Sequence, residues 1–140
     1  MKMRLSEAIL LGAMLRPQGV EDFFSVQHDP ITNQEIITSC ALGAAYEAVT
    51  GKHDMETMSN EDFREGFLSA LSLKAKMPCK CRVACGEDFG IWPLESAIPH
   101  LNDEHKWTRE RIAAWVATIE EQFAVAANAV AAMVEAVEVS

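Results

Sequence analysis

Four segments of this 140-residue chain combine a helix-start signal with apolar residues at helical spacing. In each segment a polar residue that can cap the first turn follows an apolar residue, and a second apolar residue stands four positions beyond the cap. The predicted caps are Ser6, Thr32, Ser59 and Thr108. Because capping chemistry and apolar periodicity agree, the sequence predicts a mainly α-helical domain of about four helices.

The first three predicted helices cover residues 6–16, 32–51 and 59–74. The first should end at the RPQG of residues 16–19, because proline cannot continue a helix. The second begins with a capping box formed by Thr32 and Glu35 and ends at Gly51, which suits a left-handed C-terminal position. Residues 20–27 show no pattern that we can assign.

The last predicted helix begins after Thr108 and reaches about residue 136. At 1.5 Å per residue this is a helix on the order of 40 Å long, which is more than so small a domain can cover. Its distal part, 124–134, is rich in alanine. We expect residues 124–140 to protrude and to bind a protein partner or a second copy of the chain. The alternatives are a helix that packs back on its own domain or frays beyond Phe123.

Composition favours one globular domain spanning residues 1–140, with 49% apolar and 24% charged residues. The net charge of -9 disfavours direct binding of nucleic acid, which needs Lys and Arg. No apolar stretch approaches the roughly 20 residues of a membrane span. With no export signal recognised and four cysteines, we expect a reducing compartment, namely the cytoplasm of a bacterial or phage-infected cell.

A long stretch from about residue 77 to 106, predicted to be irregular, concentrates soft metal ligands. A connection of that length is usually functional or held by something other than regular hydrogen bonds. Thiolate and imidazole are the donors that tetrahedral zinc prefers. The sequence therefore suggests a structural zinc site, with both histidines on irregular backbone before Thr108. The predicted ligands form a CysX3Cys pair and a HisX4His pair, and they are Cys81, Cys85, His100 and His105. Cys79 is an alternative ligand.

Other interpretations of these residues stay open. The cysteines can be small buried apolar groups, with the histidines orienting loop backbone through ring hydrogen bonds. A metal-dependent enzyme would replace one ligand by water. Cys40 lies on a predicted apolar helix face, which favours a core role over a nucleophile, and His28 and His53 receive no role. No phosphate-binding loop or hydrolase motif is present, so we expect a protein that is not an enzyme.

Acidic residues are concentrated in the segment 21–60, where Lys52 is the only opposing base. This asymmetry suggests an alternative function, an acidic inhibitor that mimics the charge of nucleic acid. Mimicry requires the acidic side chains to gather on one face. The segment contains Glu21, Asp22, Asp29, Glu35, Glu47, Asp54 and Glu56.

Three segments also resemble small uncharacterised proteins of phages and bacteria. They are LSEAILLGAMLRPQ at 5–18, CALGAAYEAVTG at 40–51 and HLNDEHKWTRERIAAWV at 100–116. The resemblance covers a third to a half of the chain and implies no activity. It implies a CysX2Cys pair before the last segment, whereas this chain has a CysX3Cys pair and the additional Cys79. The leading hypothesis is a non-enzymatic accessory or interaction protein of a phage or bacterium.

Overall fold

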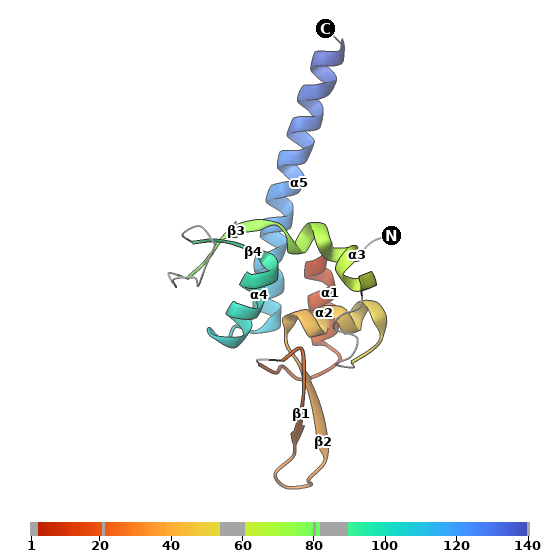
Figure 1. The fold of residues 1–140 in the computed structure, drawn as a ribbon, viewed down its shortest axis with the longest axis vertical. Helices are drawn as coiled ribbons and strands as arrows, with labels where there is room; N and C mark the ends of the chain where they lie inside the picture. The colour runs from red at the N-terminus through yellow and green to blue at the C-terminus, as the bar shows by residue number, and fades with distance from the viewer. Residues whose placement is uncertain (1–2, 21, 54–60, 80, 82–89, 140) are drawn as a thin grey trace.

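The computed structural model of the chain describes residues 3–20, 22–53, 61–79, 81 and 90–139, and side chains are described outside 61–65 and 138–139. The described part is mostly helical and carries two small antiparallel hairpins, β1–β2 and β3–β4, which confirms the predicted fold class (Figure 1). In chain order the elements are α1 (Leu5–Ala13), β1 (Phe24–His28), β2 (Glu35–Ser39), α2 (Ala41–Thr50), α3 (Glu61–Leu71), β3 (Lys74–Lys76), β4 (Ile91–Pro93), α4 (Leu94–Asp103) and α5 (Arg109–Val139).

The helices gather into a body from which two elements project in opposite directions (Figure 1). The distal half of α5 extends from one end, and the β1–β2 hairpin extends from the other. Inside the body α1 packs against both α2 and α5. The core lies where these helices meet α4, and its largest fully buried apolar side chains are Leu5, Ile9, Tyr46, Leu94, Ile98, Leu101, Ile112 and Val116.

The predicted helix over residues 32–51 is wrong in its first half. Glu35–Ser39 forms β2, which pairs with β1 in the segment that had no assignment. The run Ile36, Ile37, Thr38 is β-branched and favours a strand. Thr32 forms no capping box. Instead, the Asp29 carboxylate accepts hydrogen bonds from the N–H groups of residues 31 and 32, and these bonds fix a turn between the strands. The same two bonds lower the pKa of the Asp29 carboxyl group.

The second half of that prediction is confirmed, because α2 occupies Ala41–Thr50. Its N-cap is Cys40, whose Sγ accepts a hydrogen bond from the backbone N–H of Gly43, with 3.5 Å between nitrogen and sulphur. Its C-cap is Gly51, with a left-handed φ of 73°. The cap at Thr108 is also confirmed, because Thr108 Oγ1 accepts the N–H of Arg111 at 3.1 Å at the start of α5.

The predicted cap at Ser6 is wrong, since α1 begins at Leu5 and Ser6 is buried within its first turn. The Ser6 N–H donates instead to Oε1 of Glu120 on α5, at 3.3 Å. A carboxylate from another helix therefore takes the role of the local cap, which no local pattern reveals. The helix ends at Ala13, before the predicted limit at Arg16.

Residues 77–106 are more regular than predicted. They include β4 and α4, and β4 pairs with β3, which begins at Lys74, where the third predicted helix was expected to end; α3 itself ends at Leu71. The apolar spacing of α4, at Leu94, Ala97, Ile98 and Leu101, is a normal helical pattern, but Pro99 stands inside it and argues against a helix. The predicted cap Ser59 lies outside the described residues.

A buried arginine joins three elements at the base of α5. Arg109, 4% exposed, donates from Nη1 to Ser39 Oγ at 2.8 Å, at the end of β2. From Nη2 it donates to the carbonyl oxygens of Ala13 at 3.2 Å and Arg16 at 2.5 Å, at and just beyond the end of α1. A cation at a helix C-terminus interacts favourably with the helix dipole and satisfies open carbonyls.

Asn102 continues this network on α4 and is fully buried. Its Oδ1 accepts from Gln18 Nε2 at 3.1 Å and from the Ala41 N–H at 3.2 Å, and its Nδ2 donates to the Gly19 carbonyl at 2.9 Å. Asn102 therefore connects segments that are distant in sequence. Together, Gln18, Asn102 and Arg109 form what we term the polar hub.

The polar hub predicts a large cost for a conservative change at its centre. Lysine cannot reach Ser39 and the carbonyls of Ala13 and Arg16 together, so Arg109→Lys should lower the free energy of unfolding by about 1–3 kcal/mol. Arg4→Lys keeps the charge of an exposed side chain whose ion pair with Glu121 is 3.9 Å long, so it should change the free energy of unfolding by less than about 0.5 kcal/mol. Urea unfolding of both variants measures the difference, and equal stabilities would contradict the hub.

A close approach between α1 and α2 depends on Gly12. A Cβ added there would lie 1.8 Å from the carbonyl oxygen of Ala44. We expect Gly12→Ala to destabilise the fold by about 1–3 kcal/mol, although alanine is the better helix former. Gly66 in α3 has nothing within 4 Å of an added Cβ, so Gly66→Ala should be stabilising by up to about 1 kcal/mol. Thermal unfolding would contradict the helix packing if Gly12→Ala were also neutral or stabilising.

Candidate metal centre

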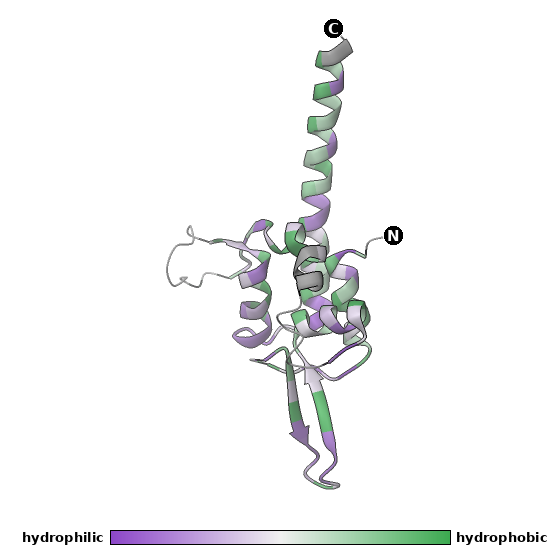
Figure 2. Cartoon of the chain, turned by 45° about the vertical axis from the view of Figure 1, so that its right-hand side comes forward, coloured by the Kyte–Doolittle hydropathy of each residue, from purple (hydrophilic) through white to green (hydrophobic). Residues whose placement is uncertain are grey.

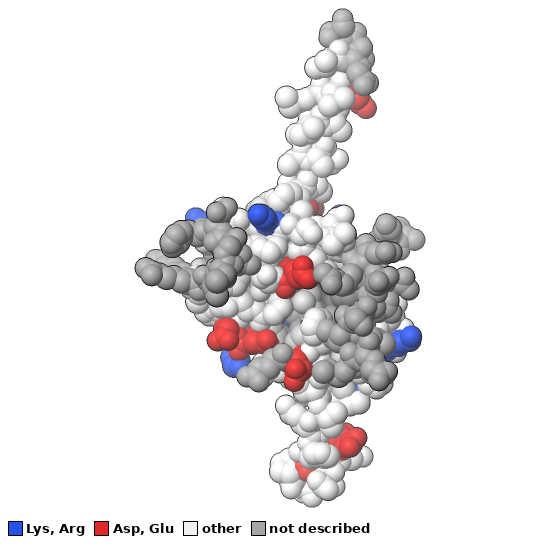
Figure 3. Space-filling view, in the orientation of Figure 1, with Lys and Arg blue, Asp and Glu red and all other residues white. Residues whose placement is uncertain are grey.

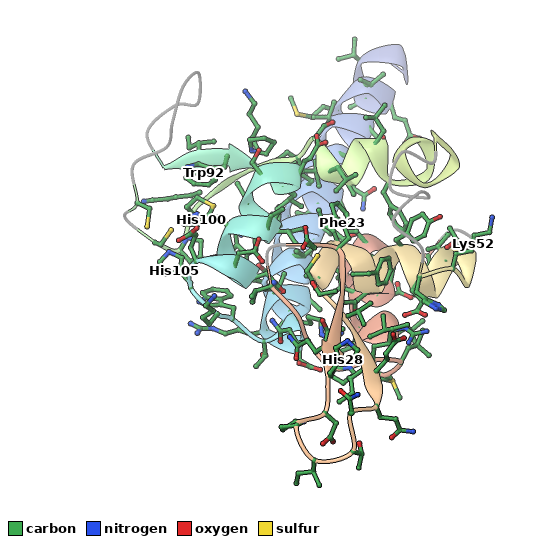
Figure 4. All side chains as sticks on the ribbon, turned by 60° about the horizontal axis from the view of Figure 1, so that its bottom comes forward. Phe23, His28, Lys52, Trp92, His100 and His105 are labelled. Carbon is green, nitrogen blue, oxygen red and sulfur yellow. The ribbon has the colours of Figure 1, made fainter. Side chains whose placement is uncertain are left out.

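Four side chains that can bind a metal ion meet at one side of the body. Cys79 and Cys81 follow β3, His100 lies on α4, and His105 lies in the connection between α4 and α5. One ligand atom from each residue can be chosen so that all four lie within 4.8 Å of one another. Figure 4 shows the two imidazoles together beside Trp92. The four residues form a Cys2His2 cluster that could hold a metal such as zinc.

The distances inside the cluster are close to the edges of a zinc tetrahedron. His100 Nε2 lies 3.1 Å from His105 Nε2 and 3.5 Å from Cys79 Sγ, and Cys81 Sγ lies 3.3 Å from His105 Nε2. With Zn–N near 2.05 Å and Zn–S near 2.3 Å, tetrahedral geometry requires about 3.4 Å between nitrogens and about 3.6 Å between nitrogen and sulphur. These three distances lie within about 0.3 Å of the tetrahedral values, and all four ligand atoms lie within 4.8 Å of one another.

Two elements place the cysteines beside α4. The β3–β4 hairpin is extended by a hydrogen bond from Met77 N–H to the Gly90 carbonyl at 2.6 Å, just before Cys79. α4 follows β4 directly, and its first N–H, on Leu94, donates to the Leu73 carbonyl at 2.9 Å. The backbone that leads to Cys79 is thereby tied to the helix that carries His100.

The end of α4 turns His105 back toward His100. Lys106 has a φ of 54°, and this left-handed residue lets the Trp107 N–H donate to the Leu101 carbonyl at 3.0 Å. A left-handed residue of this kind reverses the direction of the chain just beyond a helix end. His105 stands immediately before the left-handed residue, where its ring centroid lies 4.9 Å from that of His100.

The surroundings suit metal ligation. Trp92, 5% exposed, covers one side of His100 with ring centroids 4.7 Å apart. Desolvation and the neighbouring His105 lower the pKa of His100, which keeps the imidazole in the neutral form that binds metal. Desolvation and the Cys79 thiol raise the pKa of Cys81. A bound cation would reverse that preference, because it stabilises the thiolate.

The cluster contains three of the predicted zinc ligands, Cys81, His100 and His105, together with the alternative ligand Cys79. Cys85, the remaining predicted ligand, lies outside the described residues. The prediction that both histidines lie on irregular backbone is wrong for His100, which belongs to α4. The helix fixes that ligand more firmly than a loop would.

The core role predicted for Cys40 is confirmed, since the residue is 6% exposed. Burial raises the pKa of its thiol to about 11, which disfavours the nucleophilic thiolate.

The structure also contains a cluster of charged and titratable side chains that the sequence analysis did not predict. Arg16 Nε donates to both carboxylate oxygens of Glu47 at 2.9 Å, and Arg16 Nη2 lies 2.9 Å from His53 Nδ1.

The buried position of Glu47 affects the charge-mimicry alternative. Glu47 is 6% exposed and is bonded to Arg16, so it cannot present charge to a basic partner. Asp29, at the turn of the projecting hairpin, is engaged with its own backbone. Glu21, Asp54 and Glu56 lie outside the described residues. Asp22 and Glu35 are exposed, so charge mimicry by this segment stays a prediction.

Comparison of the chain with protein-family models, with curated proteins and with solved structures gives no match. No helix in the described ranges is both long enough and apolar enough to cross a lipid bilayer.

The geometry of the cluster indicates that Cys79 is a ligand of the bound metal. We expect purified protein to hold about one zinc per chain, and Cys79→Ser to lose most of it. Strong chelation should lower the melting temperature by about 5 °C or more, because a metal bound only by the folded chain adds several kcal/mol. Elemental analysis and thermal unfolding measure these effects.

Cys85→Ser is the matched control for this prediction, and it should keep its zinc. If Cys85→Ser loses the metal while Cys79→Ser retains it, the ligand set is the CysX3Cys pair. Melting curves that neither chelation nor Cys79→Ser changes would return these cysteines to a packing role.

Proposed function

We propose that this protein is a non-enzymatic interaction protein. In this proposal a structural zinc ion holds one side of the body together, and the distal half of α5 binds another polypeptide. The accessory role in a phage or bacterium rests on the sequence resemblance alone.

The observation that carries the proposal is the exposure of the distal half of α5, residues 121–137 (Figure 1). Every residue of this segment is exposed, and Figure 2 shows hydrophobic positions along it. Phe123 is 43% exposed, Val130 59% and Met133 67%. Covering such side chains is worth about 1.5–3 kcal/mol each, and extended apolar surface of this kind usually marks an interaction site.

The segment also lacks the charges that would keep a solvated helix apart from other proteins. Between Glu121 and Glu135 there is no Asp, Glu, Lys or Arg. The visible face of this part of α5 is correspondingly almost free of charged side chains (Figure 3). A solitary helix in water normally has a polar face, so this composition favours a helix that is covered in use.

The zinc part of the proposal rests on the donor set. Four protein ligands would fill a tetrahedral shell, which is typical of structural rather than catalytic zinc. The ligands come from the segment after β3, from α4 and from the corner before α5. An ion held there would cross-link these segments and stiffen the base from which α5 projects.

Chemical cross-linking in an extract of the expressing cell tests the interaction. We expect the wild-type chain to form adducts with another polypeptide, identical or different, and Val130→Glu to lose them because a charge enters the apolar surface. Asn128→Glu adds the same charge on the opposite side of the helix and should keep the adducts. Equal adducts from all three proteins, or none from any, would contradict the proposal.

A further inference from the structure

We propose that the polypeptide bound by the distal half of α5 is a second copy of this chain, paired antiparallel. This inference rests on the proposed function and names its partner. The surface concerned, termed the seam, consists of Phe123, Ala126, Val130, Met133 and Val137.

The seam continues a seven-residue repeat that begins inside the body. Ile112, Val116 and Ile119 occupy the same two heptad positions as the seam residues, and their side chains are buried, with 0%, 0% and 6% exposed. The repeat then continues through Phe123 and Val130 without a change of phase, but these side chains are 43% and 59% exposed. A strict seven-residue apolar repeat is the pattern by which α-helices pair lengthwise. One stripe is thus buried over its first half and uncovered over its second.

Inside the body, α1 packs against α5 beside this stripe and runs antiparallel to α5. The Ala13 carbonyl at the end of α1 meets Arg109 at 3.2 Å, and the Ser6 N–H near its start meets Glu120 at 3.3 Å. The last described contact along α1 in this direction is an exposed ion pair at 3.9 Å between Arg4 and Glu121. Beyond that point every described side chain of α5 up to residue 137 is exposed, so the stripe is open to an antiparallel helix from a second copy.

Charge favours a second copy over a basic partner. The chain carries a net charge of -9, yet the seam and its flanking positions from 122 to 134 carry none. A basic partner would find little charge to recognise there, whereas two identical neutral stripes can pair without like-charge repulsion. Residues 121–139 span about 28 Å as a helix, so antiparallel pairing keeps the two acidic bodies farther apart than the Debye length of about 10 Å at 0.1 M salt.

Side-chain sizes also suit antiparallel pairing. In an antiparallel pair, each layer joins one of the two heptad positions of one helix to the other heptad position of its partner. Phe123 of one copy then lies against Met133 of the other, and Ala126 lies against Val130. Alanines at 127 and 129 flank the centre and allow the helices to approach closely. The pair is related by a twofold axis, so each layer is repeated at both ends.

Sedimentation velocity on the full, zinc-loaded chain tests the proposal. We expect the mass to rise with concentration from 15.4 kDa toward twice that value. Val130→Glu should weaken dimerisation at least about tenfold, and Asn128→Glu should leave it unchanged. An equimolar mixture of Val130→Glu and Val130→Lys should recover dimers, because the opposite charges then lie about one helical turn apart across the seam, within reach of these long side chains.

The outcomes separate this proposal from the proposed function. Glutamate is a better helix former than valine, so circular dichroism should show an intact α5 in Val130→Glu. A monomeric wild-type chain at about 200 µM, or equal weakening by Asn128→Glu, would overturn the second-copy proposal. If that monomer still forms Val130-dependent cross-links to a different protein, the proposed function survives, and if it forms none, both fail. Small-angle scattering should show two separated bodies, and one merged body would overturn the antiparallel order.

Discussion

The buried guanidinium of Arg109 is the contact on which the arrangement of this molecule most depends. It lies at the first residue of α5 and binds the end of β2 and the final carbonyls of α1. Asn102, in the same polar hub, holds the start of α2 to the end of α4. Burying such groups is unfavourable unless their hydrogen bonds are made, so few alternative arrangements of these segments are acceptable.

The candidate metal centre and the projecting helix are both attached to this hub. Asn102 lies on α4 two residues beyond His100, and the corner that carries His105 ends where α5 begins. A hub that fixes α4 and the base of α5 therefore also brings the two imidazoles together. Cys79 and Cys81 join them through the β3–β4 hairpin. In our proposal, zinc completes a corner that the polar network has already placed.

The candidate site could be predicted only in part. Soft donors clustered along one segment were enough to suggest zinc and to name Cys81, His100 and His105. Sequence spacing could not single out Cys79, since its place beside α4 depends on how β3 pairs with β4. The placement of His100 on a helix was missed because Pro99 hid the pattern of α4.

Local patterns were sufficient to predict the mainly helical class, the Thr108 cap, the Gly51 end of α2 and the long last helix, because these depend on interactions between residues close in sequence. Tertiary structure decided the rest. Glu120 took the place of a local cap for α1, and β1 drew residues 35–39 out of the predicted helix. It also decided where the apolar stripe of α5 is covered, because the body packs only against its first half. Contacts between distant segments outweighed weak local preferences, and a pattern read along the chain does not contain them.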